Sequence, residues 1–234
     1  MCVAHSVAHP ASAIPPMVSG LLMRNGTVFE PSTGGNVVDV LGCCGTCVDS
    51  PLYKPQVIGK MPLMSEEQAL AVLEDAKQAW NGGSGVWPQM RLGDRIHAIK
   101  NFITELKSSR ESIINVLMWE IGKNTPDATA EFDRTVQFIE SMISEIQTDP
   151  EFNSDWETIG TTRAFVRRTA IGIIMCLGPY NYPLNETWAM VFAALLAGNV
   201  LILKIPTVGG LCHFLTSKCV GWCVGITNPV VNFL

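Results

Sequence analysis

Apolar side chains in the middle of the chain recur at steps of three and four residues, the spacing of amphipathic helices. Ser65-Glu-Glu-Gln68 has the pattern of a capping box and opens the first helix, which Gly82-Gly83-Ser84-Gly85 breaks. Ser109 is a candidate cap for the third helix, and Thr125-Pro126 opens the fourth. The apolar stripes of the second and fourth helices comprise Leu92, Ile96, Ile99, Phe102, Ile103 and Leu106, and Phe132, Val136, Ile139, Met142, Ile143 and Ile146.

Short strands are expected ahead of these helices. Residues 20–30 predict two strands around Asn25-Gly26, a strong hairpin-turn pair. Residues 36–41 and 56–62 predict two more strands. The stretch between them, residues 42–55, is interpreted as a surface insertion.

Towards the carboxyl end, the stripes give way to continuous apolar runs. Residues 171–177 predict a strand suited to a buried parallel sheet, and Val200–Lys204 predicts a second strand. Pro183 starts a helix between them, and Gly198 is a natural helix stop. Together they form a βαβ unit with parallel strands and an α/β fold. A further helix over 210–224 and a strand over 230–234 are expected to extend it.

Two loops follow the strands of this unit, at the edge where open α/β sheets bind ligands. The first contains Tyr180, Asn181 and Tyr182, and the second begins at Lys204. An ammonium leaving a buried strand needs water or an anion, so Lys204 is either a phosphate or ribose contact or a solvent-facing strand end. Since no G-x-G-x-x-G follows a predicted strand, the pattern alone indicates no more than an α/β domain suited to a nucleotide.

Composition narrows the class of protein. Of the 234 residues 47% are hydrophobic and 16% charged, which allows a sizeable core. The net charge of -5 argues against nucleic-acid partners and acidic membrane surfaces. The most apolar run, residues 188–197, is shorter than the roughly 20 residues of a membrane span, and the first 23 residues lack the basic region of a signal peptide. A cytoplasmic protein is therefore expected.

Cysteines offer a second interpretation. Cys43, Cys44 and Cys47 form a local cluster with one C-x-x-C spacing. A zinc site would need a second pair of ligands, and the candidates lie far along the chain on a predicted helix. We interpret the thiols as reduced, as in a reducing compartment, and keep a metal site as the minor alternative. The distant candidates are Cys212, His213, Cys219 and Cys223.

Several segments resemble the aldehyde dehydrogenase superfamily. Gly178-Pro-Tyr-Asn-Tyr-Pro183, a helix, Ala197-Gly-Asn-Val200, an apolar strand and then Lys204 are similar to the first half of its cofactor domain. The likeness begins near Leu21. It is greatest for NADP-dependent, non-phosphorylating glyceraldehyde-3-phosphate dehydrogenases, through Trp119-Glu-Ile-Gly-Lys-Asn124, Glu131-Phe-Asp-Arg-Thr135 and Tyr180-Asn-Tyr-Pro-Leu-Asn-Glu186. The resemblance implies an incomplete Rossmann-type parallel sheet with flanking helices.

The resemblance also implies a cofactor site. Lys204 would contact the adenosine ribose and a 2′-phosphate, and Pro179 and Tyr180 would line the same site. NAD-preferring relatives commonly place an acidic residue at the position of Thr207. A neutral Thr207 removes that repulsion, so the expected cofactor is NADP in preference to NAD.

The reaction follows from the same resemblance. In the family a cysteine attacks the aldehyde, hydride passes to the nicotinamide, and water hydrolyses the thioester. Asn181 would donate to the oxygen that gains charge in the transition state. Arg134 and Tyr182 would bind the phosphate of the substrate, although on pattern alone Arg134 is a solvated helix charge. The implied reaction is oxidation of glyceraldehyde 3-phosphate to 3-phosphoglycerate.

We expect four segments: a loose start over 1–20, strands and helices of the cofactor domain over 21–148, an oligomerisation strand segment over 149–168, and the βαβ core over 169–234. The family places its nucleophile in Gly-Gln-x-Cys and its general base in Glu-Leu-Gly-Gly, and neither string occurs. The chain is therefore expected to be truncated within the cofactor domain and inactive alone. The alternative is a non-catalytic, shortened paralogue that associates with full-length subunits of this homo-oligomeric family.

Overall fold

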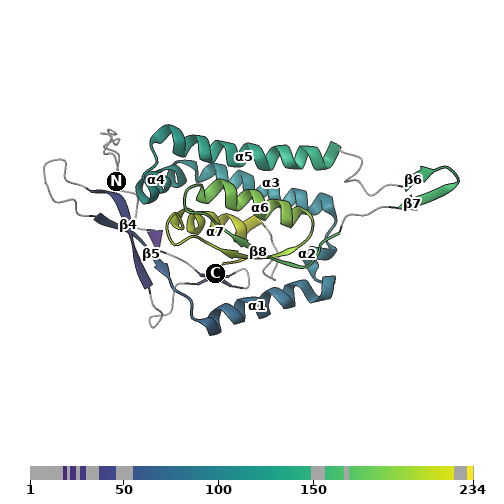
Figure 1. The fold of residues 1–234 in the computed structure, drawn as a ribbon, viewed down its shortest axis with the longest axis horizontal. Helices are drawn as coiled ribbons and strands as arrows, with labels where there is room; N and C mark the ends of the chain where they lie inside the picture. The colour runs from purple at the N-terminus through teal and green to yellow at the C-terminus, as the bar shows by residue number, and fades with distance from the viewer. Residues whose placement is uncertain are drawn as a thin grey trace.

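The computed structural model describes residues 18–19, 22–24, 27–29, 37–45, 55–148, 156–165, 169–223 and 231–233. Strands β8, β9 and β10 form a parallel sheet in the order β10-β9-β8. Helices α3, α5 and α6 are stacked on one side of this sheet and α1 lies on the other (Figure 1). The strands are β1 (Val18–Ser19), β2 (Leu22–Arg24), β3 (Thr27–Phe29), β4 (Val37–Gly45), β5 (Pro55–Pro62), β6 (Trp156–Ile159), β7 (Thr162–Phe165), β8 (Ile173–Leu177), β9 (Val200–Lys204) and β10 (Val231–Phe233). The helices are α1 (Glu66–Trp80), the 3-10 turn η1 (Asn81–Gly83), α2 (Val86–Gln89), α3 (Leu92–Ser108), α4 (Arg110–Ile121), α5 (Thr125–Thr148), α6 (Pro183–Leu196) and α7 (Leu211–Cys223).

The predicted capping box opens α1. The Ser65 side chain accepts from the Gln68 amide at 3.3 Å, and the Gln68 side chain accepts from the Ser65 amide at 2.8 Å. The helix ends at Asn81, whose φ of 45° is left-handed. The glycines that follow prevent the helix from continuing, as the sequence predicts.

The boundary between α3 and α4 differs from the expectation. Ser109 stands in the N-cap position of α4, but its side chain makes no capping hydrogen bond. Its amide instead donates to Glu105 and Leu106, which completes the last turn of α3. The Ser109 backbone therefore ends α3 with its amide and begins α4 with its carbonyl, which accepts from Ile113, while its hydroxyl does not act as the predicted cap. Gly122 ends α4 with a φ of 73°.

The amino-terminal strands pair as predicted. Strands β2 and β3 are antiparallel, with Arg24 opposite Thr27 across the two-residue Asn25-Gly26 connection. Strands β4 and β5 are also antiparallel, but Gly45 pairs with Pro55, so the pairing extends into the predicted insertion. Part of the predicted insertion is therefore strand, and its remainder, residues 46–54, lies outside the described residues, as does most of the segment 1–20. Strand β1 of that segment pairs parallel to β5.

The expectation of a buried β8 is wrong for the part of the chain that the structure describes. In strand β9 all side chains except Lys204 are buried, whereas in β8 only Cys176 is. The side chains of Met175 and Leu177 are 55% and 65% exposed. The reason is position in the sheet, because β8 lies at an edge and β9 at the centre. An apolar run alone does not distinguish the two positions.

Aromatic packing holds the helical layer together. The Phe102 ring of α3 lies 5.0 Å from Trp188 and 4.9 Å from Phe192 of α6, centroid to centroid. At the other end of α6, Asn199 accepts from the amides of Ile171 and Gly172 and donates to Ala194. These hydrogen bonds fix the end of α6 to the start of β8. Among the described residues, no helix has the length and apolarity to cross a bilayer.

Candidate functional site

The loops that follow β8 and β9 meet at the carboxyl edge of the sheet. Leu177 pairs with Lys204 at the ends of the two strands, and the Gly178 amide donates to the Lys204 carbonyl at 3.0 Å. A Cβ on Gly178 would lie 2.6 Å from the hydroxyl oxygen of Thr187 and 2.9 Å from Pro206. Only glycine allows this approach, so Gly178 is required by packing.

A second glycine closes the contact from the other side. Gly209 has a φ of 87°, and a Cβ there would lie 2.9 Å from Cγ of Pro183 and 3.2 Å from the Tyr180 carbonyl oxygen. The loop after β9 therefore packs directly on the loop after β8. The two predicted site segments form one continuous surface.

The first loop presents its side chains to solvent. Tyr180 is 68% exposed, Asn181 is exposed and Tyr182 is 39% exposed, whereas Pro179 is half-buried. Within the described part of the chain, the Asn181 side chain has no hydrogen-bond partner. Its amide is therefore available to donate to a ligand.

The second loop places a cation and a hydroxyl at the same edge. The Lys204 ammonium group donates to the Ile205 carbonyl at 3.1 Å, and the residue is exposed. Thr207 is exposed three residues later. The segment from Lys204 to Gly210 has no acidic residue, so it presents one formal positive charge.

A buried carboxylate holds the first loop in place. Glu131 of α5 is 1% exposed, and its Oε1 accepts from the amides of Leu184 and Asn185 at 2.9 and 3.2 Å. These are among the unpaired amides that begin α6. The residue in the N-cap position, Tyr182, makes no capping bond with its side chain. Glu131 therefore replaces a local cap, and its charge is favourable at the positive end of the helix.

Lys123 connects this carboxylate to the predicted site. Its ammonium group forms an ion pair with Oε2 of Glu131 and lies 3.8 Å from the centre of the Tyr182 ring. The Lys123 side chain is 13% exposed. Pairing satisfies the buried charge of Glu131, and the cation–π contact fixes the ring of Tyr182.

Arg134 is exposed on α5 and lies one residue before Thr135. The Thr135 hydroxyl accepts from the Asn185 side chain at 3.3 Å, so this turn of α5 faces the start of α6. Among the described residues no hydrogen bond, ion pair or ring contact joins Arg134 to Tyr182. The structure thus brings Lys123, not Arg134, into contact with the Tyr182 ring.

A second buried carboxylate holds the other loop. Glu120 of α4 is 4% exposed and accepts from the amides of Gly209, Gly210 and Leu211 at 2.8, 2.9 and 3.0 Å. These amides form the start of α7. Burial raises the pKa of Glu120 from 4.5 to about 7, and the three amide hydrogen bonds lower it only in part.

Sequence reasoning did not identify Glu120, Glu131 or Lys123 as site residues, although all three lie in quoted motifs. One sequence signal points to Glu120, and a second indicates that α6 and α7 need remote caps. Glu120 is a charge in the otherwise apolar segment Val116–Ile121. Helices α6 and α7 also follow Tyr182 and Gly210, neither of which has a good capping side chain, so their caps must come from elsewhere.

Of the distant members of the proposed metal set, Cys212 and His213 are buried in α7, and the side chains of Cys219 and Cys223 lie outside the described residues. Cys212 Sγ donates to the Gly209 carbonyl at 3.3 Å, and burial raises its pKa well above the usual value. Burial lowers the pKa of His213 to about 3. No group of three metal-ligating side chains gathers in the described ranges. Cys47 and the side chains of Cys43 and Cys44 lie outside them.

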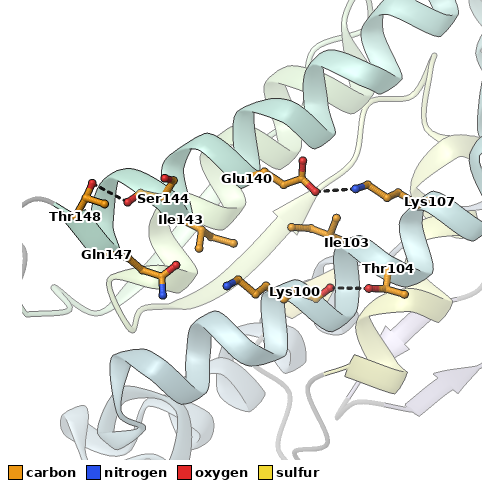
Figure 2. A pocket seen from close by; sticks show the side chains of 9 residues that line it. All are labelled: Lys100, Ile103, Thr104, Lys107, Glu140, Ile143, Ser144, Gln147 and Thr148. Atoms are coloured by element: carbon orange, nitrogen blue, oxygen red, sulfur yellow. Dashed lines mark hydrogen bonds and ion pairs between the residues drawn. The ribbon is translucent and has the colours of Figure 1, made fainter.

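A surface hollow lies away from these loops, between α3 and α5. Figure 2 shows the Lys107–Glu140 ion pair at one end of it and Lys100 near the middle. Its floor is formed by Ile103 and Ile143. None of the site residues predicted from the sequence lines it. It is therefore separate from the site at the edge of the sheet.

Comparisons with known proteins agree with this architecture. Residues 47–234 match the model of the aldehyde dehydrogenase family. The chain is 28% identical over 191 residues to an NADP-dependent glyceraldehyde-3-phosphate dehydrogenase of Streptococcus equinus, covering 77% of this chain and 39% of the relative. A protein of the same description from Pisum sativum is 28% identical over 189 residues, covering 78% and 36%.

A solved structure shows the same fold. The NADP-dependent glyceraldehyde-3-phosphate dehydrogenase of Bacillus halodurans C-125, complexed with NADP, superimposes with a TM-score of 0.76 at 22% identity. The match covers 92% of this chain and 43% of that one. The chain thus spans about two fifths of the length of these proteins. With four fifths of its residues within the family match, the chain belongs to the aldehyde dehydrogenase family.

Proposed function

We propose that this chain supplies the NADP-binding and substrate-orienting half of an aldehyde dehydrogenase site that oxidises glyceraldehyde 3-phosphate to 3-phosphoglycerate. The observation that carries the proposal is the meeting of two loops at the carboxyl edge of the sheet. One loop carries Asn181 and Tyr182, and the other carries Lys204 and Thr207. The relatives from Streptococcus equinus and Pisum sativum, named as NADP-dependent dehydrogenases of this substrate, support the choice.

The second loop fits a 2′-phosphorylated ribose. Lys204 supplies a cation, Thr207 a hydroxyl donor, and the absence of an acidic side chain from Lys204 to Gly210 removes repulsion of a phosphate. Pro179 and Tyr180, from the neighbouring loop, would line the same cofactor site. Bound NADP would accept a hydride from the aldehyde. The role of these residues is to hold the adenosine end at the sheet edge.

Asn181 is proposed as an oxyanion donor. Its side chain is exposed and unbonded among the described residues, whereas the backbone after it is anchored by Glu131. A donor that is already oriented stabilises developing charge without reorganising, and one such donor contributes about 3–4 kcal/mol to a transition state. The rigid start of α6 provides this orientation.

Arg134 and Tyr182 are proposed to bind the substrate's phosphate. Both are solvent-accessible, and they lie on α5 and at the start of α6, which are in contact through Thr135 and Asn185. Lys123 adds a cation beside the Tyr182 ring. The phosphate is therefore expected between α5 and the first loop.

The 234 residues contain neither Gly-Gln-x-Cys nor Glu-Leu-Gly-Gly. We therefore expect no aldehyde oxidation from these residues alone. Thioester formation by the isolated chain would overturn this expectation. The proposed contribution is to binding and orientation, and the sulfur nucleophile would come from other residues.

The hairpin of β6 and β7 supports the alternative function of association with another aldehyde dehydrogenase subunit. It projects from the end of the molecule, away from the helical layer (Figure 1). Its apolar side chains Trp156, Ile159 and Phe165 are 58%, 70% and 48% exposed. Co-purification with a full-length aldehyde dehydrogenase, lost when these side chains are replaced by Ser, would support this role.

The test of the cofactor proposal is a binding titration with 2′,5′-ADP and 5′-ADP. The chain should prefer 2′,5′-ADP, because only this ligand carries the 2′-phosphate that Lys204 and Thr207 would contact. Thr207→Glu should reverse the preference, and in a full-length version it should change the selectivity from NADP to NAD. Lys204→Met should weaken the binding of 2′,5′-ADP more than that of 5′-ADP. Equal affinity for the two ligands in the unsubstituted chain would contradict the proposal.

A further inference from the structure

One helix pair holds both loops of the site. Helices α4 and α5 are consecutive, and each contributes one fully buried glutamate to the start of a different helix of the βαβ region. Glu120 binds the amides that begin α7, and Glu131 binds the amides that begin α6. The two capped helix starts immediately follow the loops of Thr207 and Asn181.

We infer that Glu120 and Glu131 are positioning residues. From a single helix pair they fix the cofactor loop, which carries Lys204 and Thr207, and the oxyanion loop, which carries Asn181. The inference rests on the proposed function for the meaning of the loops. It assigns neither residue a contact with substrate or cofactor. Each acts through the backbone that it holds.

Both carboxylates use both of their oxygens. Glu120 Oε1 accepts from Gly209 and Gly210 while Oε2 accepts from Leu211. Glu131 Oε1 accepts from two amides while Oε2 pairs with Lys123. A glutamine has the same shape but only one acceptor oxygen. Glu→Gln at either position therefore removes an acceptor without opening a cavity.

The two anchors differ in what balances their charge. Glu131 has the Lys123 ammonium group, whereas the hydrogen-bond partners of Glu120 among the described residues are amides alone. Since burial raises the pKa of Glu120, the closed turn binds a proton on this carboxyl more tightly than an opened, hydrated turn would. Its pKa of about 7 puts this proton uptake near neutral pH. The cofactor loop, which precedes this turn, should therefore be held more firmly at pH 6 and loosen as the pH rises through 7.

On α7, Cys212 follows Leu211, whose amide binds Glu120. Burial raises the pKa of the Cys212 thiol, and the charges of Glu120 and Glu131 raise it further. His213 follows Cys212, and burial keeps its pKa at about 3. Lys123, after α4, is paired with Glu131. The Cys212 thiol and the His213 imidazole are therefore both neutral between pH 6 and 8, and they add no opposing transition.

The test is backbone hydrogen exchange, measured by NMR on the 234-residue chain. Glu120→Gln should speed the exchange of the Gly209, Gly210 and Leu211 amides about tenfold and leave Leu184 and Asn185 within about twofold. Glu131→Gln should do the reverse. Glu140→Gln, an exposed carboxylate on α5, is the matched control and should change neither group.

A measurement on the unsubstituted chain keeps the inference testable if a variant does not fold. Exchange of the Gly209, Gly210 and Leu211 amides, corrected for intrinsic rates, should slow down between pH 8 and 6 relative to amides inside α3. Exchange that is unchanged over this range, or variants that affect both loops equally, would overturn the inference.

Binding of 2′,5′-ADP separates this inference from the proposed function. Glu120→Gln should weaken it about tenfold while Glu140→Gln leaves it unchanged, because a loosened loop no longer presents Lys204 and Thr207 together. Unchanged affinity with a loosened turn would contradict the link to the site. If the unsubstituted chain does not bind 2′,5′-ADP, the NADP proposal fails, and the exchange rates still decide whether the glutamates position the loops.

Discussion

The loop after β8 and the loop after β9 are anchored in the same manner, but their anchors are not equivalent. Each precedes a helix whose first amides bind a buried glutamate from the α4–α5 pair. At the first loop the glutamate is paired with Lys123, which also lies over the Tyr182 ring. At the second loop Glu120 has three amides and a pKa of about 7.

The difference shows that the start of a helix substitutes only in part for a cation. Three amide hydrogen bonds and the positive end of α7 stabilise an ionised Glu120 only in part, so burial still raises its pKa. A direct ion pair holds Glu131 in place and ties it to the Tyr182 ring. The second anchor is therefore expected to respond to pH near 7.

The largest expected effect comes from breaking the ion pair of the first loop. Lys123→Met leaves the carboxylate of Glu131 buried without its cation, which should lower the free energy of unfolding by about 3–5 kcal/mol. Urea denaturation measures this change. Lys107→Met breaks the exposed pair with Glu140 and should cost less than about 1 kcal/mol. Equal costs for the two variants would show that the buried pair has no special weight.

The next effect separates the second anchor from the first by pH. The pKa of Glu120 is higher in the fold than its ordinary value of 4.5, so the folded chain binds more protons between pH 4.5 and 7. The contribution of Glu120 to stability is therefore present below pH 4.5 and is lost as the pH rises to about 7. The loss amounts to about 3 kcal/mol. The free energy of unfolding should depend less on pH across this range in Glu120→Gln than in the unsubstituted chain. An equal dependence in the two would contradict the assignment.

A smaller effect tests the contact between the loops. Gly209→Ala places a side chain at a φ of 87° and against the Pro183 ring, so it should destabilise the chain by about 1–3 kcal/mol. Gly93 of α3 is the control, because a Cβ there meets nothing within 4 Å. Gly93→Ala should be neutral or stabilising. A Gly209→Ala variant as stable as the unsubstituted chain would mean that the loops are not packed together.

The sequence predicted the elements well because their signals are local. The Ser65 capping box, the stripe of α5 and the turn at Gly198 each need only neighbouring residues. The edge position of β8 was not predictable, because Ile173–Leu177 and Val200–Leu203 are equally apolar and the order of strands is a property of the whole sheet.

The same distinction applies to the site. Asn181, Lys204 and Thr207 were predicted as site residues from a motif and from their place after strands. Glu120 and Glu131 act on amides 53 to 91 positions further along the chain, and no local pattern reports such a contact. In the sequence, the burial of Glu120 was indicated only by its charge in an apolar helix. No such signal indicated the burial of Glu131.

The most direct test of the central claim, that the two loops form one NADP site, is hydrogen exchange of the chain with and without NADP. NADP should protect amides of both loops, between Gly178 and Pro183 and between Lys204 and Leu211, more than NAD does. The hollow of Lys100 and Gln147 between α3 and α5 is an internal control and should show no protection. Protection confined to that hollow, or no protection at either place, would contradict the claim.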